Sequence, residues 1–469
     1  MTRPDFDLLV VGGGSAGFAA AIRGVELGAR VGLLEGGTLG GTCVNVGCVP
    51  SKTLIRAAEA LHRRTHHGFA GIPASDGKPD WTAVRAQKDE LVEELRTAKY
   101  WDVLHSYAGI DLIEQRATLE TGGTVRLADG TNVSAGKVIL TTGASPWVAP
   151  IPGLAASPYL DSAGATALEQ LPASMIVIGG SAVGLELAQM FARLGVEVTV
   201  LEALPTVVPM EDPTVGTALA KYLVAEGLRI ETNVRIERVE STAKRHAVHY
   251  HRGSTSGSVV AEQVLVATGR RPNTHGLGLE KVGITVGHKS EIVVNEYLRT
   301  ANPNAYAAGD VIGDPMFVYV AAYGGGIAAG NALTGDQVRY DLTALPRVTF
   351  TDPAVAAVGL MEPEARAKGI DPLVSRLPLD QVPRALAARD TRGFVQLIAD
   401  KDSRRLIGAQ ILAPEAGELI TEAAVAIRFG LTIEDLRATF HPYLTLGEGI
   451  KLAAMAFDKD LAKLSCCAA

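Results

Sequence analysis

Short, mostly apolar runs that lead directly into glycines recur along the chain. The first run, Phe6–Val11, predicts a buried strand, and the alanine-rich segment after Gly12–Gly17 predicts a helix. A second run, Val31–Leu34, predicts another strand and leads into Glu35. A strand, a glycine turn, a helix and a second strand in this order are typical of a dinucleotide-binding unit.

Three glycines of the first turn fit the G-x-G-x-x-G fingerprint: Gly12, Gly14 and Gly17. Glycines permit a tight turn and let backbone N–H groups approach a pyrophosphate at the N-terminus of the following helix. Glu35, at the end of the second strand, is placed to accept hydrogen bonds from a ribose. The first unit is therefore predicted to bind a dinucleotide.

The same arrangement returns later in the chain. An apolar run leads into Gly179, Gly184 follows, and the next strand leads into Glu202. The acid follows the first glycine by 23 positions in both units. Ser181 replaces the middle glycine and adds a small side chain where a phosphate should approach, which weakens the match without breaking it. This internal duplication predicts two bound dinucleotides.

Three further runs end at glycines. Val138–Ala144 and Val264–Arg270 are each predicted to be a strand that closes at a glycine, and proline follows each of them. Such breaks suit the points where one nucleotide-binding domain is inserted into the other. The third run, Asn304–Asp310, ends in Gly-Asp, where the acid can hydrogen-bond a ribose; a plain turn is the alternative. Between the two units, Trp81–Leu104 has helical periodicity.

From about Asp341 the pattern changes to separate strands and amphipathic helices without a glycine fingerprint. Strands are predicted over Val348–Phe350, Ala354–Val358, Phe394–Ile398 and Ile407–Leu412, and helices over Ala416–Phe429 and Ile433–Thr439. This is a third, α+β domain. The predicted fold class is α/β, with domains over residues 1–146 and 266–340, 147–265, and 341–469.

Composition narrows the class of protein. A chain of 469 residues with 47% hydrophobic and 20% charged residues can bury more than one core. Its net charge of −7 is spread along the chain and gives no basic field for nucleic acid or an anionic membrane, so small ligands are the expected partners. The first residues contain no apolar signal segment, and no apolar run is long enough to span a bilayer. We therefore expect a cytoplasmic protein.

The four cysteines form two close pairs, which are too few for a disulfide scaffold and indicate functional thiols in a reducing compartment. Cys43 and Cys48 can close a small disulfide ring or, when reduced, offer two thiolates to an electrophile or a soft metal ion. A structural disulfide is the alternative. If this stretch opens a helix, Lys52 lies one turn past Cys48, and its charge favours a thiolate there.

The second pair, Cys466 and Cys467, lies three residues from the end of the chain and is called the tail pair below. Adjacent residues have Cα atoms about 3.8 Å apart, which is closer than an unstrained disulfide prefers, so the pair should persist as a dithiol. A dithiol on a terminal segment can bind a soft cation. Two terminal cysteines without a function are the alternative.

With these motifs in order, the chain resembles the flavin-dependent pyridine nucleotide disulfide oxidoreductases over nearly its whole length. The resemblance implies that the first unit binds FAD, that the second binds NAD(P)H, and that the last domain forms a homodimer interface. It implies FAD or NAD(P)H contacts at Gly12, Gly14, Gly17, Glu35, Gly41, Thr42, Lys52, Gly143, Asp310, Gly179, Gly184, Glu202 and Gly269. It also places Lys52 and Glu186 near the flavin N5.

Within this family, disulfide reductases carry a His-Pro-Thr-x-x-Glu run whose histidine, supplied by the other subunit, acts as acid and base on the dithiol. Aligning the present chain on Thr445 and Glu448 puts Tyr443 in that catalytic position. A tyrosine titrates at about pH 10 and is a poor base at neutral pH. His441 is interpreted as structural, because aligning on it leaves Glu448 two residues out of place.

The tail pair then resembles that of the mercuric reductases of this family. By this resemblance, the tail pair of one subunit takes Hg(II) from solution thiols and passes it to Cys43 and Cys48 of the other, so the active sites are shared. NAD(P)H reduces FAD, and the electrons reduce the bound Hg(II) to Hg(0). The four cysteines are thus the expected metal ligands, and Tyr100 and Tyr443 match the two active-site tyrosines. Ligand exchange explains why no catalytic histidine is needed.

Two features depart from that group. Many of its members carry an N-terminal Cys-x-x-Cys metal-binding domain, whereas this chain begins at the FAD strand, so delivery of the metal should rely on the tail pair. Glu202 favours a free ribose 2′-hydroxyl and repels a 2′-phosphate, and Ala203, Leu204 and Pro205 bring no compensating cation. The sequence therefore predicts a preference for NADH over the NADPH that is usual in this group.

Two rival functions follow from the same residues. A dihydrolipoamide or other small-disulfide reductase needs the histidine that is missing here. A thiol metal-binding or trafficking protein without turnover has no use for two dinucleotides. Arg63, Arg64, His66 and His67 could suggest an accessory metal site, but a solvated helix end explains them better, since no second ligand group lies at matching spacing.

Overall fold

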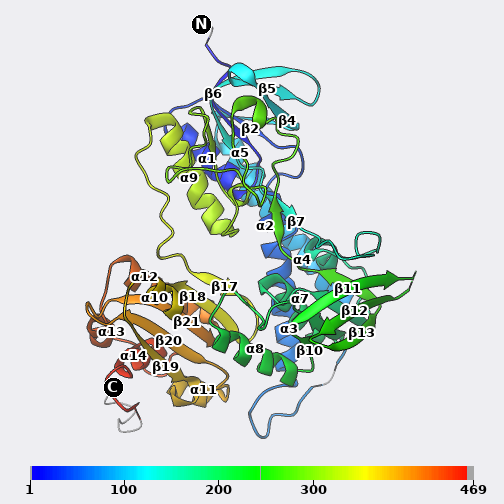
Figure 1. Cartoon of the computed structure of the whole chain (residues 1–469), viewed down its shortest axis with the longest axis vertical. Helices are drawn as coiled ribbons and strands as arrows, with labels where there is room; N and C mark the ends of the chain where they lie inside the picture. The colour runs from blue at the N-terminus through cyan, green and yellow to red at the C-terminus, as the bar shows by residue number, and fades with distance from the viewer. Residues whose placement is uncertain (1–2, 76, 243, 462–469) are drawn as a thin grey trace. The chain divides into compact units, whose positions relative to one another are not determined.

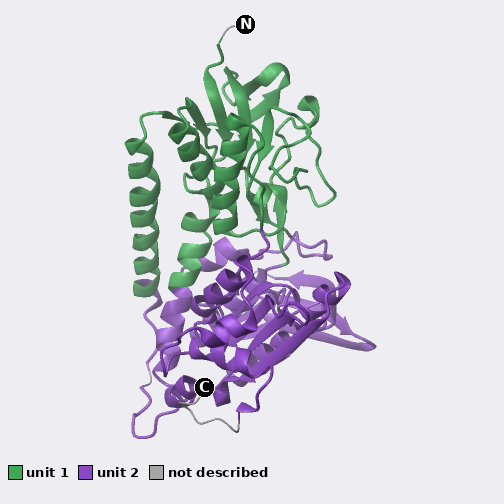
Figure 2. Ribbon diagram, turned by 90° about the vertical axis from the view of Figure 1, so that its left-hand side faces the viewer, with its two compact units in different colours: residues 1–53, 83–147, 268–341 green, residues 54–82, 148–267, 342–469 purple. Residues whose placement is uncertain are grey.

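The computed structural model describes residues 3–75, 77–242 and 244–461. The chain forms two compact units, each assembled from segments that are distant in sequence (Figure 1, Figure 2). Unit 1 holds residues 1–53, 83–147 and 268–341, and unit 2 holds residues 54–82, 148–267 and 342–469.

Unit 1 is built on a sheet whose central strands are parallel, in the order β3, β2, β1, β6 and β16. Their bounds are β1 (Phe6–Val11), β2 (Val31–Leu34), β3 (Ile110–Ile113), β6 (Asn132–Leu140) and β16 (Ala305–Ala307). An antiparallel hairpin, β4 (Ala117–Glu120) and β5 (Thr124–Leu127), pairs with the start of β6. The apolar runs of the sequence thus become strands in the interior of a sheet, where both faces are covered.

Two helices of small residues pack together over one face of this sheet: α1 (Ser15–Glu26) and α9 (Val318–Thr334) (Figure 1). Their backbones approach so closely that a Cβ at Gly325 would lie 2.0 Å from the Ala16 carbonyl oxygen. Alanine and glycine permit this contact, and it buries the apolar side of both helices. The N-terminus of α1 is thereby fixed at the carboxyl end of β1.

The segment 148–267 of unit 2 repeats the design with a parallel sheet in the order β10, β9, β8 and β14. The bounds are β8 (Ser174–Ile178), β9 (Glu197–Leu201), β10 (Arg229–Glu231) and β14 (Gln263–Val266), with helices α6 (Ser162–Thr166), α7 (Ala182–Arg193) and α8 (Pro213–Ala225). An antiparallel sheet adds β11 (Val234–Ser241), β12 (His246–Arg252) and β13 (Thr255–Ala261). Apolar residues of the two sheets form one core.

The segment 342–469 of unit 2 contains a five-stranded antiparallel sheet in the order β17, β18, β21, β20 and β19. The strands are β17 (Arg347–Thr349), β18 (Ala354–Gly359), β19 (Pro372–Pro378), β20 (Phe394–Asp400) and β21 (Leu406–Ala413). The helices are α10 (Glu362–Ala367), α11 (Pro383–Ala388), α12 (Ala416–Arg428), α13 (Ile433–Ala438) and α14 (Glu448–Met455). The sheet and helices share a separate apolar core, so the predicted α+β organisation is confirmed.

The remaining elements include α2 (Gly41–Asn45), α3 (Cys48–Arg63), α4 (Trp81–Arg96), a π-helical turn η1 (Thr97–Trp101) and α5 (Asp102–Ser106). The two strands that the sequence extends to glycine end earlier, β6 at Leu140 and β14 at Val266. Gly143 and Gly269 have φ values of +69° and +114°, outside the β region, so neither can continue a strand. The short strands β7 (Ala144–Pro146) and β15 (Arg270–Pro272) pair there instead.

No helix among the described residues is both long and apolar enough to cross a membrane.

Candidate active site

The glycine turn between β1 and α1 is a cradle that side chains would fill. Gly12 has a φ of +113°, and a Cβ there would lie 2.4 Å from the Thr141 carbonyl oxygen. At Gly17, a Cβ would lie 1.8 Å from the Gly12 carbonyl oxygen. Gly14 caps α1 without a side-chain hydrogen bond, so the helix N-terminus is left to bind an anion. These residues fit the pyrophosphate of FAD.

Glu35 lies beside the first fingerprint, as the sequence predicts. Its Oε2 accepts a hydrogen bond of 2.8 Å from the Gly13 N–H, and its Oε1 accepts one of 2.7 Å from the Gly37 N–H. The carboxylate is therefore held directly beside the fingerprint turn, at the carboxyl end of β2. A carboxylate oxygen has more than one lone pair, so both oxygens can still accept hydrogen bonds from ribose hydroxyls.

Asp310 lies at the carboxyl edge of the same sheet. It follows β16, which pairs with β6 next to the strand that carries the fingerprint, and it opens a short 3₁₀ turn, η4 (Asp310–Ile312). Burial raises the pKa of Asp310, and the Arg270 guanidinium, 3.8 Å away, opposes that rise. The carboxyl ends of parallel strands are where such sheets bind ligands, so the position suits a ribose or polyol contact better than a plain turn.

The second fingerprint in unit 2 has the same geometry as the first. Gly179 has a φ of +112°, and a Cβ at Gly184 would lie 2.0 Å from the Gly179 carbonyl oxygen. Glu202 Oε2 accepts a hydrogen bond of 2.6 Å from the Gly180 N–H, and Oε1 accepts one of 2.7 Å from the Leu204 N–H. The two fingerprint units, which match in sequence spacing, therefore also match in the hydrogen bonds of their acidic residues.

The Cys43–Cys48 pair lies beside the first fingerprint. Cys43 is on α2 and Cys48 is the first residue of α3, and both side chains are half-buried. A Cβ at Gly41, the first residue of α2, would lie 2.8 Å from the Gly14 Cα, so α2 starts against the FAD turn. The sequence prediction that this stretch opens a helix is confirmed, and Lys52 lies one turn past Cys48.

The two cysteines interact directly. The pKa of the Cys43 thiol is raised, chiefly by its side-chain hydrogen bond with Cys48, then by burial and by the charge of a Cys48 thiolate. The Lys52 ammonium acts in the opposite direction. The geometry therefore favours a state in which Cys43 keeps its proton and shares it with Cys48, while the nearby cation favours negative charge on the pair.

Tyr100 is brought to the dithiol by the π-helical turn η1. Its ring meets Phe18 edge-on at a centroid distance of 4.9 Å, and its hydroxyl forms a hydrogen bond with Ser15. Burial raises the pKa of Tyr100, the Ser15 bond lowers it, and the charges of Cys43 and Cys48 raise it further. The predicted active-site tyrosine therefore lies within electrostatic reach of both thiols. The π turn is a departure from plain helix of the kind often found at functional sites.

The C-terminal run places His441 and Tyr443 in different environments. The His441 side chain is only 5% exposed; its Nε2 lies 2.7 Å from Glu422 Oε1 and its Nδ1 lies 3.0 Å from the Thr439 carbonyl oxygen. Tyr443, in contrast, is 50% exposed. Both ring nitrogens of His441 have partners in its own subunit, as a structural histidine requires. The tail pair lies outside the described residues.

Two predictions remain to be located in the structure, Glu186 and the possible accessory metal site near Arg63. Glu186 lies on α7 in unit 2, where it is buried and its Oε1 accepts a hydrogen bond of 2.9 Å from the Phe350 N–H. Among the described residues there is no group of three or more histidine, cysteine or acidic side chains that could hold a metal ion. The Arg63 side chain is 61% exposed and pairs with Glu59, in agreement with a solvated helix end.

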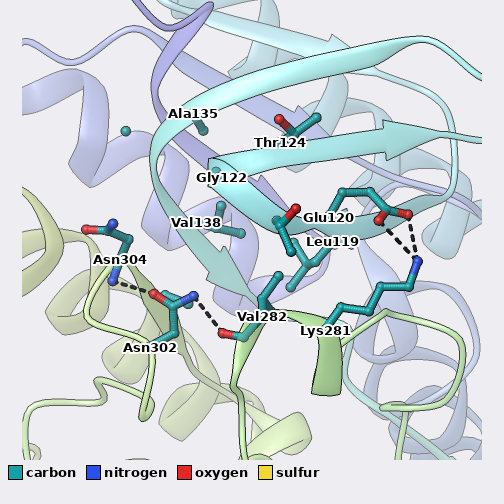
Figure 3. Close-up of a pocket in the computed structure, with 14 residues that line it drawn as sticks. Leu119, Glu120, Gly122, Thr124, Ala135, Val138, Lys281, Val282, Asn302 and Asn304 are labelled. Carbon is teal, nitrogen blue, oxygen red and sulfur yellow. Dashed lines mark hydrogen bonds and ion pairs between the residues drawn. The ribbon is translucent and has the colours of Figure 1, made fainter. Parts of the chain in front are cut away.

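A cavity of about 330 Å³ lies elsewhere in unit 1, between β4, β6 and the segment around Asn302 (Figure 3). Its polar side chains bind one another: Lys281 Nζ lies 2.9 Å from Glu120 Oε1, and Asn302 Nδ2 donates to the Val282 carbonyl oxygen at 3.0 Å. These pairs occupy the groups that would recognise a polar ligand. The cavity therefore has no role in the chemistry below.

Two family models match the chain. The model described as pyridine nucleotide-disulphide oxidoreductase matches residues 6–325, and the dimerisation domain of the same family matches residues 345–454. The chain belongs to the pyridine nucleotide-disulphide oxidoreductase family. As a member of this family it uses FAD and NAD(P)H and forms a homodimer, and the two glycine cradles described above fit the two dinucleotides.

Known members of this family align with nearly the whole chain. The mercuric reductase of Staphylococcus aureus is 46% identical over 99% of this chain and 84% of its own length. That of Streptomyces lividans is 44% identical over 99% of this chain and 98% of its own length. Among solved structures, the Cu(II) complex of the HOCl-induced flavoprotein disulfide reductase RclA from Escherichia coli matches 97% of this chain and 99% of that chain, with a TM-score of 0.86 and 30% identity.

Several residues that support the candidate site were not predicted from the sequence. Ser15 holds Tyr100, and the Thr141 hydroxyl donates to the Gly12 carbonyl oxygen at 2.9 Å. Ser15 stands at a variable position of the fingerprint and Thr141 follows β6, and a serine or threonine in a turn has many other uses. Phe350, which binds Glu186, carries no signal because the contact uses its backbone.

Proposed function

We propose that the protein is a mercuric reductase, which reduces Hg(II) to Hg(0) with NAD(P)H. The observation that carries this proposal is the Cys43–Cys48 pair, two thiols in hydrogen-bond contact beside the FAD cradle. The similarity to mercuric reductases over the full length of the chain supports it. The reaction balances as Hg(II) and NAD(P)H giving Hg(0), NAD(P)⁺ and a proton.

Two adjacent thiols suit this substrate. Hg(II) is a soft cation, and thiolates are the ligands that such ions prefer. Binding requires deprotonated sulfur, so the metal displaces the proton that Cys43 shares with Cys48, and the Lys52 charge stabilises the anionic pair until the metal arrives. Bound FAD supplies the two-electron transfer between nicotinamide and the dithiol site. Hg(0) then leaves, because a neutral atom has little affinity for thiolates.

The C-terminal run favours metal exchange over disulfide reduction. Reduction of a disulfide breaks its S–S bond and releases a thiolate that must be protonated, which a histidine can do at neutral pH and a tyrosine, which titrates at about pH 10, does poorly. In this chain the half-exposed residue is Tyr443, whereas His441 is bound to Glu422. Transfer of Hg(II) from one thiolate to another requires no such proton donor. Tyr443 and Tyr100 are proposed to shape the metal site.

Delivery of the metal is proposed to use the tail pair, Cys466 and Cys467. In the homodimer, the tail pair of one subunit would take Hg(II) from small thiol complexes and transfer it to Cys43 and Cys48 of the other. A dithiol can compete with two separate thiols because its second bond forms within one molecule. NAD(P)H and reduced thiols are both abundant in the cytoplasm, and the reaction is proposed to take place there.

One assay on the purified holoenzyme separates the candidates. NAD(P)H oxidation is followed after addition of Hg(II) with excess small thiol and, in parallel, of oxidised lipoamide, and volatile mercury is trapped. Hg(II)-dependent oxidation with release of mercury vapour is the expected result. NAD(P)H oxidation with lipoamide alone would show a small-disulfide reductase instead. Hg(II) binding without NAD(P)H oxidation would show a metal carrier.

A matched pair of variants ties the activity to the dithiol. Cys43→Ser keeps the size of the side chain but removes the soft ligand, and it should abolish release of mercury. Val46→Ala, at an exposed position between the two cysteines, should retain it. Mercury release by the Cys43→Ser variant at the wild-type rate would contradict the proposed site.

A further inference from the structure

Glu202 is a buried acid fixed in one orientation. It is 7% exposed, and its two carboxylate oxygens accept hydrogen bonds from the Gly180 and Leu204 N–H groups at 2.6 and 2.7 Å. Its own N–H donates to the Glu231 carbonyl oxygen of the neighbouring strand at 2.8 Å. Two backbone N–H groups therefore hold the carboxylate beside the second fingerprint, and it cannot rotate away from a ligand without losing both hydrogen bonds.

The first unit contains the same arrangement around Glu35. There the carboxylate accepts hydrogen bonds from the Gly13 and Gly37 N–H groups, at 2.8 and 2.7 Å, with the same sequence spacing as in the second unit. FAD carries an adenosine ribose with free hydroxyls. The first arrangement therefore belongs to a site for an unphosphorylated ribose, and the second unit reproduces it atom for atom among the groups that hold the acid.

We infer that the second unit selects NADH over NADPH, with Glu202 as the residue that sets this specificity. The inference rests on the proposed function only in taking the second unit as the site of the reductant. A free 2′-hydroxyl can donate to the Glu202 carboxylate, whereas a 2′-phosphate brings about two negative charges against it. At a separation of about 4 Å, such repulsion corresponds to at least a tenfold difference in affinity.

The surroundings of Glu202 do not compensate a phosphate. After Glu202 come Ala203, Leu204, which is 49% exposed, and Pro205, none of which is cationic. Two arginines, Arg229 on β10 and Arg252 on β12, pair with Glu231 at 3.1 and 3.2 Å. Their charges are engaged by an acid rather than directed to a ligand, so the edge of the sheet remains favourable for a neutral ribose.

The test measures reductant choice without mercury. Anaerobic bleaching of the yellow holoenzyme by NADH and by NADPH gives the two rates, and calorimetric titration with NAD⁺ and NADP⁺ gives the two affinities. Both should favour the unphosphorylated form by about tenfold or more. Equal values, or an advantage for the phosphorylated form, would overturn the inference. A holoenzyme that prefers NADH but releases no mercury vapour would refute the proposed function and leave this inference standing.

Variants separate charge from fold. Glu202→Gln keeps the size but removes the charge and should narrow the preference by about tenfold or more. Glu197→Gln, an exposed acid at the start of the same strand, makes the same change in net charge and should leave the preference unaltered. Leu204→Arg keeps Glu202 and adds a cation at an exposed site, so it should improve the use of NADPH even if Glu202→Gln fails to fold. No change in Leu204→Arg would count against the assignment.

Discussion

The Nε2 atom of His441 lies 2.7 Å from Oε1 of Glu422, in hydrogen-bond contact within one subunit. Because the other ring nitrogen lies 3.0 Å from the Thr439 carbonyl oxygen, the imidazole has no nitrogen left to serve a dithiol. His441→Asn should lower the free energy of unfolding by about 1–3 kcal/mol through loss of a buried contact. Its kcat/KM for Hg(II) should stay close to that of the wild type, as measured by NAD(P)H oxidation.

The matched variant is Tyr443→Phe, which removes the hydroxyl of a half-exposed side chain. Its thermal midpoint should be unchanged, whereas its kcat/KM for Hg(II) should fall by roughly tenfold if the phenol contacts the metal site. Loss of activity in His441→Asn together with an unaffected Tyr443→Phe would reverse the assignment of these two residues.

The stability of the chain should depend on pH through His62. Burial lowers the pKa of His62 to about 4, the Arg193 charge adds to this effect, and Glu226 opposes it. The folded pKa lies below the ordinary value of 6.5, so the unfolded chain binds the proton more tightly. The contribution of His62 is fully present above pH 6.5 and is lost as the pH falls towards 4.

Thermal unfolding measured across this pH window checks the prediction. The thermal unfolding midpoint of the His62→Gln variant should fall less on acidification than that of the wild type, because the variant has no imidazole at this position to protonate. His66→Gln is the matched control, since His66 stacks on His62 at a centroid distance of 4.0 Å but is exposed. An identical pH slope in the wild type and in His62→Gln would contradict the prediction.

Arg193 is the centre of a buried ion network. Its side chain is 4% exposed and contacts Glu226 at 2.8 Å and Asp352 at 2.9 Å. Arg193→Met would remove the most buried cation of the network and leave both carboxylates to Arg392 alone, which lies 3.1 Å from Glu226 and 2.9 Å from Asp352. It should lower the free energy of unfolding by about 3 kcal/mol, the lower end of the cost of breaking a buried ion pair. Arg366→Met breaks an exposed pair with Glu362 and should cost about 0–1 kcal/mol. Urea denaturation of both variants measures the difference, and equal losses would contradict the argument.

A comparison of this network with the FAD cradle shows why only part of the structure could be predicted from the sequence. Gly12 and Gly17 could be predicted because their constraint is local: a turn of this shape excludes any side chain. The partners of Arg193 could not, because Asp352 is 159 residues away and an arginine at the end of α7 is expected for helix electrostatics alone. Local geometry is visible in a sequence, whereas a pairing that depends on the packing of distant segments is not.

The sequence predicted neither β19 and α14 nor the short helices α10 and α11 of the last domain. β19 runs from Pro372 to Pro378, and prolines at both ends suggest turns; an edge strand tolerates them because it pairs on one side only. α14 opens at Glu448, a residue that the sequence assigned to a catalytic run instead. The other four strands of this domain and helices α12 and α13 were predicted, because each has an apolar face with the period of its element.

The acidity of Cys43 should depend on Cys48. The hydrogen bond with Cys48 is the largest cause of the raised pKa of Cys43, so Cys48→Ala should bring this pKa down towards its ordinary value. With Cys466 and Cys467 also replaced by alanine, the rate at which the reduced protein reacts with a disulfide reagent, measured against pH, reports the thiolate of Cys43. Asn45→Ala, on the same helix α2, controls for loosening of that helix. If the Cys43 thiol of the Cys48→Ala variant titrated at the same pH as in the wild type, or at a higher pH, the contact with Cys48 would not govern the acidity of Cys43.

The tail pair should matter most when Hg(II) arrives on bulky ligands. The Cys43–Cys48 pair is half-buried, so a large mercury complex reaches it poorly, whereas two cysteines near the chain terminus can exchange with it first. A Cys466→Ala, Cys467→Ala variant should therefore lose about tenfold or more in kcat/KM with Hg(II) bound to a bulky thiol and little with Hg(II) bound to a small one. Ser465→Ala controls for changes in the terminal segment itself. Equal loss with both complexes would mean that the tail cysteines act at the reducing site rather than in delivery, and no loss with either would mean that Hg(II) reaches Cys43 and Cys48 directly.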